Sequence, residues 1–194
     1  MIDNKCRRVQ LAIKMIVGPI RCRSVLIRYV CFLVPAWLSG LLYCGQAGAA
    51  PALQIQSGVV TRVVDGDTVW VKTSVAAHPL KVRISGIDAP EICQAGGGDA
   101  RDALKQRVLG QLVTISFKQY DSYGRALASV AWHGEDIGRW MVVNGYAWSY
   151  RFRRSAGPYA AEQSQAVQLK RGIFGMGGAQ NPRTFRKRHG SCYS

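Results

Sequence analysis

The sequence predicts an α+β fold, in which at least five short strands form a small, closed or nearly closed β-barrel with about three helices. Three observations support this prediction. Runs rich in Val and Thr recur along the chain, glycine-containing turns separate them, and apolar residues at helical spacing lie between them. Short antiparallel strands with interspersed helices are typical of small barrels.

The strands are predicted from alternating, β-branched runs and from the turns that bound them. Asp65-Gly66 is a hairpin-type turn that divides the first run into two strands. Gly86, inside a later run, indicates a bulge or a close backbone approach. His133-Gly134 marks the turn after the last strand. The predicted runs cover residues 58–71, 80–87, 112–117 and 126–132.

The helices are predicted between and after these strands. Ala100, Ala103, Leu104 and Val108 recur at helical spacing, as do Ile137, Trp140 and Met141. A third helix is expected to open at Pro158, a favoured first-turn residue, and to run to about Arg171. Residues 172–178 are predicted to form a glycine-rich loop. The basic run at residues 183–189 is interpreted as a solvated charge run, which could also add nonspecific affinity for DNA.

The 194 residues are predicted to comprise an N-terminal appendage and a single domain. Residues 1–28 carry seven Lys and Arg, and residues 29–61 carry no charge. With the small pair Ala47 and Ala49, this pattern predicts a signal peptide over residues 1–49, and the domain then spans residues 50–194. The alternatives are an uncleaved anchor, which Pro35 would interrupt, and a lipid-modified Cys44.

Charge and cysteine content further narrow the function classes. Without residues 1–49, the chain keeps 19 Lys and Arg against 10 Asp and Glu, so the predicted domain carries a net charge of +9. A basic domain suits nucleic acid or an anionic membrane surface. Cys93 and Cys192 also remain, as a disulfide in an oxidising compartment or as two buried thiols. No Cys/His cluster has the spacing of a zinc site.

Three short segments carry the candidate chemistry: Asp65 to Thr68, Arg83 to Glu91, and Tyr123 to Arg125. Their carboxylates can bind a hard divalent cation, and their guanidinium groups can bind phosphate oxygens in a bidentate manner. Pro90 forces an extended exit from the strand, which carries Glu91 to the same mouth as Asp88. Glu91 could then deprotonate an attacking water. Each segment alone also fits an ordinary turn or a surface salt bridge.

The order and spacing of these segments resemble those of the staphylococcal nuclease (thermonuclease) family. The similarity extends through Val143-Asn-Gly-Tyr-Ala147 and covers roughly residues 58–174. It implies a calcium-dependent nuclease on a five-stranded OB-fold barrel. By position, Asp67 and Asp88 resemble the carboxylate ligands of calcium. Ala89, where the founding member has Thr, resembles the ligand that uses its main-chain carbonyl.

The same resemblance assigns roles to the remaining site residues. Asp65 matches an acid beside the metal that does not contact it, and Glu91 matches the general base. Arg83 and Arg125 match the two catalytic arginines that bind phosphate. The nucleotide-stacking positions align poorly; the candidates for nucleic-acid binding are Tyr123, Tyr150 and Arg151.

The leading hypothesis is an exported, monomeric, calcium-dependent endonuclease, secreted or periplasmic. It would cut DNA and RNA, preferably single-stranded, with little sequence specificity and leave 3′-phosphate ends. A second hypothesis is a noncatalytic nucleic-acid-binding or scaffold module on the same fold; the presence of every catalytic acid and arginine argues against it. A third is a membrane-anchored surface nuclease, if the N-terminal segment is not cleaved.

Overall fold

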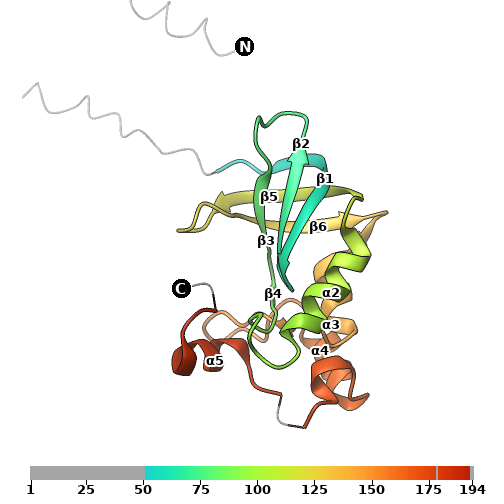
Figure 1. Ribbon diagram of the computed structural model, residues 1–194, viewed down its shortest axis with the longest axis vertical. Coiled ribbons are helices and arrows are strands. Elements are labelled where there is room, and N and C mark those ends of the chain that lie inside the picture. Colours follow the sequence, from blue (N-terminus) through green and yellow to red (C-terminus); the bar gives the residue numbers. More distant parts are fainter. Residues whose placement is uncertain (1–50, 178, 193–194) are drawn as a thin grey trace, which may run out of the picture. The chain divides into compact units, whose positions relative to one another are not determined.

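A computed structural model describes residues 51–177 and 179–192 (Figure 1). The predicted signal segment, residues 1–49, lies outside the described residues. No helix in the described part has the length and apolar character needed to cross a bilayer. The elements are β1 (Gln54–Asp65), β2 (Thr68–Thr73), β3 (Leu80–Ile84), β4 (Ile87–Asp88), α2 (Gly97–Val108), β5 (Leu112–Tyr120), β6 (Ala126–Trp132), β7 (Glu135–Asp136), α3 (Ile137–Val143), β8 (Trp148–Ser149), α4 (Ala160–Gln168), the 3₁₀ turn η2 (Gly172–Phe174) and α5 (Pro182–His189).

Five strands form a closed barrel, which confirms the predicted α+β barrel and its OB-fold. The strand order is β3-β2-β1-β5-β6, and every neighbouring pair in this series is antiparallel. A parallel pairing of β3 with β6, with Val82 opposite Ala126, joins the two ends of the series. Closure satisfies the backbone groups that an open sheet would leave unpaired at its edges.

Alternating residues of the strands fill the barrel. On β5, Val113, Ile115 and Phe117 are buried, whereas the residues between them are more exposed. On β2, Val69 and Val71 are also buried. This alternation is the one that the sequence predicts, because successive side chains of a strand point to opposite faces.

Three helices, α2, α3 and α4, gather at one end of the barrel (Figure 1). Helix α2 buries Ala100, Leu104 and Val108 against the core, as predicted. Helix α3 begins where the side chain of Asp136 accepts a hydrogen bond from Arg139 N, and it ends before Gly145, which has a φ of 73°.

The third helix is shorter than predicted. It begins at Ala160 rather than Pro158 and ends at Gln168 rather than Arg171. Pro158 instead packs on the turn between β3 and β4: a Cβ added to Gly86 would lie 2.8 Å from its Cγ atom. Gly86 has a φ of 78°, so the predicted close approach is confirmed, and the run over residues 80–87 is divided at this turn.

Residues 183–189, interpreted as a solvated charge run, are mostly exposed, but Arg186 among them is partly buried. They belong to α5, a fourth α-helix within the described residues. Asn181 caps this helix by accepting a hydrogen bond from Arg183 N, and Pro182 occupies the first turn. Both are ordinary helix-start signals, which the density of positive charge obscured.

We expect Leu104→Ala to lower the free energy of unfolding by about 2–5 kcal/mol, because it opens a cavity beneath α2. Leu112→Ala on β5 provides the control, since that side chain is 65% exposed. Its effect should stay within about 0.5 kcal/mol. Urea unfolding followed by circular dichroism measures both, and equal effects would contradict the assignment of Leu104 to the core.

Candidate active site

A cleft of about 1360 Å³ opens where the β1–β2 turn, the β3–β4 segment and the β5–β6 turn meet. Most of the predicted site residues line it: Asp65, Asp67, Arg83, Ala89, Glu91, Tyr123, Arg125 and Tyr150. Asp88 is buried and contacts two residues of the cleft. Arg151 is exposed and does not line the cleft, so the structure separates it from the others.

The β1–β2 turn holds Asp67 at the centre of a hydrogen-bond network. Asp67 N donates to Asp65 Oδ1 at 3.0 Å, which fixes the two acids side by side. The Asp67 carboxylate accepts from Thr68 Oγ1 at 3.1 Å and from Ala89 N at 2.9 Å. The last bond joins the first predicted segment to the second across 22 positions of sequence.

Carboxylates crowd at this point with little access to water. Burial, and next the charge of Asp67, raise the pKa of Asp65 to about 7. Burial also raises the pKa of Asp88, although hydrogen bonds and charge from Arg186 and Arg83 oppose the effect. A buried group of like charges of this kind needs cations or donors beside it.

Arg83 provides one of these cations. Its Nη1 lies 2.9 Å from Asp67 Oδ2, and its Nη2 lies 3.4 Å from Asp88 Oδ1. Nη1 also donates to the carbonyl oxygens of Ile84 and Ile87, each at 3.1 Å. The side chain is only 15% exposed. The ion pairs of Arg83 are therefore largely buried within the candidate site. The alternative interpretation, a surface salt bridge, does not describe them.

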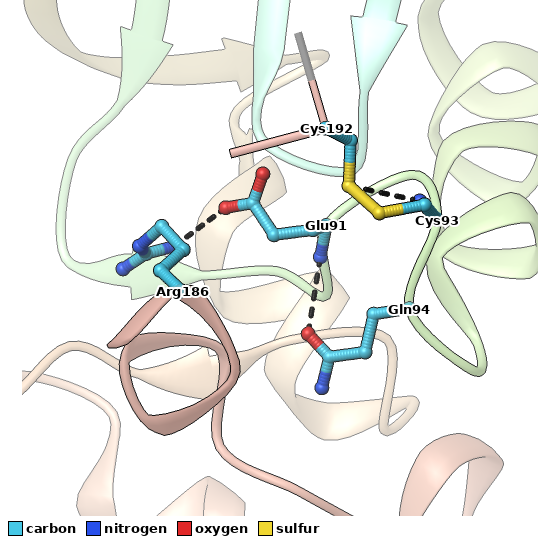
Figure 2. The surroundings of a disulfide bond; sticks show 5 residues. All are labelled: Glu91, Cys93, Gln94, Arg186 and Cys192. Atoms are coloured by element: carbon cyan, nitrogen blue, oxygen red, sulfur yellow. Dashed lines mark hydrogen bonds and ion pairs between the residues drawn. A yellow bond between two sulfur atoms is a disulfide. The ribbon is translucent and has the colours of Figure 1, made fainter. Parts of the chain in front are cut away.

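The loop after Pro90 brings Glu91 to the cleft, as the sequence predicts. Gln94 stabilises this loop: its Oε1 accepts from Glu91 N at 3.3 Å, and its own N donates to Glu91 O at 2.8 Å (Figure 2). Between them, Cys93 forms a disulfide with Cys192, 99 positions away. The structure thus selects the disulfide over the two free thiols.

The β5–β6 turn presents Arg125. Asp121 Oδ1 accepts from the backbone N of Tyr123 and of Arg125, and Asp121 Oδ2 accepts from Arg125 Nε at 2.8 Å. Gly124 has a φ of 72°, which closes the tight turn that the sequence predicts. Burial would raise the pKa of Asp121, but the hydrogen bonds from Arg125 and Tyr123 outweigh it and lower the pKa.

Two aromatic side chains stand at the edge of the cleft. Tyr123 is 79% exposed, and its ring lies 5.3 Å from the Arg125 guanidinium carbon. Tyr150 is 42% exposed. Trp148, by contrast, is buried against Phe174 and belongs to the core. Lys81 and Lys118, which the sequence analysis did not single out, also line the cleft.

One further site residue, Arg186 of α5, was not predicted. Its guanidinium contacts both oxygens of Asp88, and its Nη1 lies 2.7 Å from Glu91 Oε1. Arg186 is 95 residues from Glu91 in sequence, and no local pattern indicates such a contact. The cleft therefore contains Arg186 in addition to the two predicted catalytic arginines, Arg83 and Arg125.

These observations agree with three comparisons to known proteins. The family described as Staphylococcal nuclease homologue matches residues 81–174. A protein of Escherichia coli O157:H7 named as an uncharacterized endonuclease is 39% identical over 118 residues, which are 60% of this chain and 76% of that protein. A micrococcal nuclease of Shigella flexneri is 34% identical over 151 residues, which are 72% of this chain and 85% of that protein.

The chain belongs to the staphylococcal nuclease family. It is a nuclease, that is, a hydrolase whose substrate is nucleic acid. The family is metal-dependent in general. Within the described residues, no group of three or more His, Cys, Asp and Glu side chains is arranged to hold a metal ion.

The metal ligands that the family resemblance implies are two carboxylates and a main-chain oxygen, those of Asp67, Asp88 and Ala89. The chemistry of the donors fits a hard cation, because Asp67, Asp88 and the Ala89 carbonyl offer only oxygen. The electrostatics fit as well. The carboxylates of Asp67 and Asp88 are buried beside positive side chains and hydrogen-bond donors, and their negative charge would also stabilise an added cation.

We expect Gly66→Ala to weaken the site and the fold together. A Cβ at Gly66 would lie 2.7 Å from Ala89 Cβ and 2.8 Å from Ala100 Cβ, so the turn must move away from the second segment. The cost should be about 1–3 kcal/mol in unfolding free energy, with a loss of nuclease activity.

Gly98→Ala in α2 is the matched control for this prediction, because no atom lies within 4 Å of the added Cβ. Thermal unfolding and a cleavage assay on the two variants should separate them. If Gly66→Ala kept the stability and the activity of the wild type, neither property would depend on the close contact between the first and second segments.

Proposed function

We propose that this nuclease is a calcium-dependent phosphodiesterase that cuts DNA and RNA internally with little sequence specificity and leaves 3′-phosphate ends. One observation supports this above all: Ala89 N donates a hydrogen bond to Asp67, and both residues line one cleft together with Glu91 and Arg83. The family comparison supports the same reaction class.

Asp67, Asp88 and the Ala89 carbonyl would hold the calcium ion. Calcium accepts several oxygen ligands in flexible geometry, which suits two carboxylates and one carbonyl supplemented by water. When bound, the ion supplies positive charge that polarises a phosphoryl oxygen. Asp65 supports this arrangement indirectly, by accepting the hydrogen bond from Asp67 N.

Glu91 would accept a proton from the water that attacks phosphorus. Glu91 lines the cleft, and its side chain is 15% exposed. Water can therefore reach it, although the protein covers most of its surface. The bond from phosphorus to the 5′ oxygen would break, the 5′ oxygen would take a proton from solvent water, and the phosphate would stay on the 3′ side. Arg83 and Arg125 would bind the phosphate oxygens and stabilise the charge that develops on them.

The cleft also supports a preference for single strands. Tyr123 and Tyr150 offer exposed rings on which unpaired bases can stack, and Lys81 and Lys118 add positive charge along the same opening. Neither aromatic contact requires a particular base, which accords with low sequence specificity. Arg151, outside the cleft, would contribute only through its charge.

We also propose that the protein is exported and acts as a monomer. The disulfide between Cys93 and Cys192 supports a secreted or periplasmic location, because such bonds persist in oxidising compartments. A membrane-anchored nuclease is the alternative if residues 1–49 are retained. N-terminal sequencing of the exported protein distinguishes the two.

We expect cleavage of denatured DNA to require calcium and to stop on addition of a calcium chelator. Glu91→Gln should lower kcat by about 10²–10⁴-fold, because an amide cannot accept the proton. Glu162→Gln is the control, since Glu162 on α4 does not line the cleft and, among the described residues, forms an ion pair only with Arg139. Undiminished cleavage with chelator present would exclude the metal assignment.

We expect Arg125→Lys to lower kcat by about tenfold or more, because an ammonium group cannot reproduce a bidentate contact to phosphate. Arg101→Lys on α2 is the control, because the Arg101 side chain is 39% exposed and, within the described part of the chain, forms an ion pair only with Asp102. Single-turnover rates of both variants provide the measurement. Full activity of Arg125→Lys would remove this residue from the catalytic set.

A further inference from the structure

The C-terminal helix places one arginine among the acids of the nuclease site. Arg186 Nη1 lies 2.7 Å from Glu91 Oε1, and the same guanidinium contacts Asp88 at 3.2–3.3 Å through both of its terminal nitrogens. Figure 2 shows the side chain pointing from α5 toward Glu91. None of the three segments that define the family resemblance contains this residue.

Helix α5 is attached at both ends to the loop that carries Glu91. Before the helix, the carbonyl oxygen of Gln180 accepts a hydrogen bond from Gln94 Nε2 at 2.6 Å. After the helix, Cys192 forms its disulfide with Cys93. Both attachments lie within three residues of Glu91. They hold α5, which carries Arg186, against the loop that carries Glu91 (Figure 2).

The other basic residues of α5 do not share this environment. Arg183, Lys187 and Arg188 are exposed, and their side chains make no hydrogen bond or ion pair within residues 51–177 and 179–192. Arg186 alone among these four is partly buried, with 35% of its side chain exposed. The contact therefore depends on position in the helix and not on the overall charge of the run.

Glu91 needs a partner of this kind. It lies outside every strand and helix, and its side chain has three rotatable bonds. Among the described residues, its carboxylate bonds only to Arg186. A guanidinium group presents several N–H donors in a fixed plane, so it can bind Asp88 and Glu91 at once and hold one relative to the other.

We propose that Arg186, anchored on Asp88, is a positioning residue that holds the Glu91 carboxylate in place for proton transfer, and that the tethered helix α5 delivers it. This inference rests on the proposed role of Glu91. Each carboxylate oxygen has two lone pairs, so Asp88 can bind a cation and keep a hydrogen bond from Arg186.

The decisive experiment compares Arg186→Ala and Arg186→Lys with Arg188→Ala, which removes the same charge from the exposed side of the helix. Denatured DNA is cleaved at saturating calcium, and kcat and KM are measured separately. We expect Arg186→Ala to lower kcat by about tenfold or more with KM within about threefold, because the group acts on the reacting base and not on substrate affinity.

The lysine variant should recover part of the lost kcat, and Arg188→Ala should match the wild type. Calorimetric titration with calcium should show that Arg186→Ala still binds the ion. Circular dichroism should show an unchanged fold.

Four results would overturn the proposal. A kcat above that of the wild type would make Arg186 a competitor of the metal, and equal kcat and KM would leave it without a role in the reaction. A higher KM with unchanged kcat would make it a simple phosphate contact. Loss of calcium binding would make it part of the metal site. Glu91→Gln is measured in parallel: if that variant stays active, the proposed role of Glu91 has failed rather than the link to Arg186.

A second set of variants tests the tether. Cys93→Ser/Cys192→Ser should lower kcat in the same direction, with calcium binding retained. Adding Arg186→Ala to this pair should then cost a smaller factor than it costs in the wild type, because coupled residues are not additive. An undiminished factor would show that the disulfide does not place Arg186.

Discussion

The site depends on the balance of charge around a small group of buried carboxylates. Asp65 accepts a hydrogen bond from Asp67 N, Asp67 accepts one from Ala89 N, and Asp88 lies in β4, so these acids are restrained from moving apart to relieve their repulsion. Arg83 and Arg186 offset that repulsion from two sides. A divalent cation would offset the same repulsion. The affinity for a metal ion and the positions of the guanidinium groups therefore depend on each other.

The barrel explains why these groups meet at all. Pairing of β3 with both β2 and β6 brings the β1–β2 turn, the end of β3 and the β5–β6 turn to one opening. Each turn is short and hydrogen-bonded, so each side chain emerges in a defined direction. The acids come from the first two segments, Arg83 from the second and Arg125 from the third, so negative and positive groups meet at the same cleft.

Much of this arrangement was predictable from local sequence, because local physics determines it. The Asp65-Gly66 turn, the exit imposed by Pro90 and the turn around Gly124 each depend on residues adjacent in the chain. Arg186 was not predictable in this way, since its contacts cross 95 residues and require the tail to fold back. The helix itself did carry a signal, Asn181-Pro182, that the run of positive charge obscured.

The Cys93–Cys192 bond closes a covalent loop that contains most of the nuclease, from the residue before Gln94 to the end of the tail. Residues 151–156, a fully exposed loop, lie within this span. A single peptide-bond break there would leave two pieces still joined through sulfur. One piece would carry Glu91 and the other α5, so the disulfide would keep both contributors to the cleft in one covalent molecule.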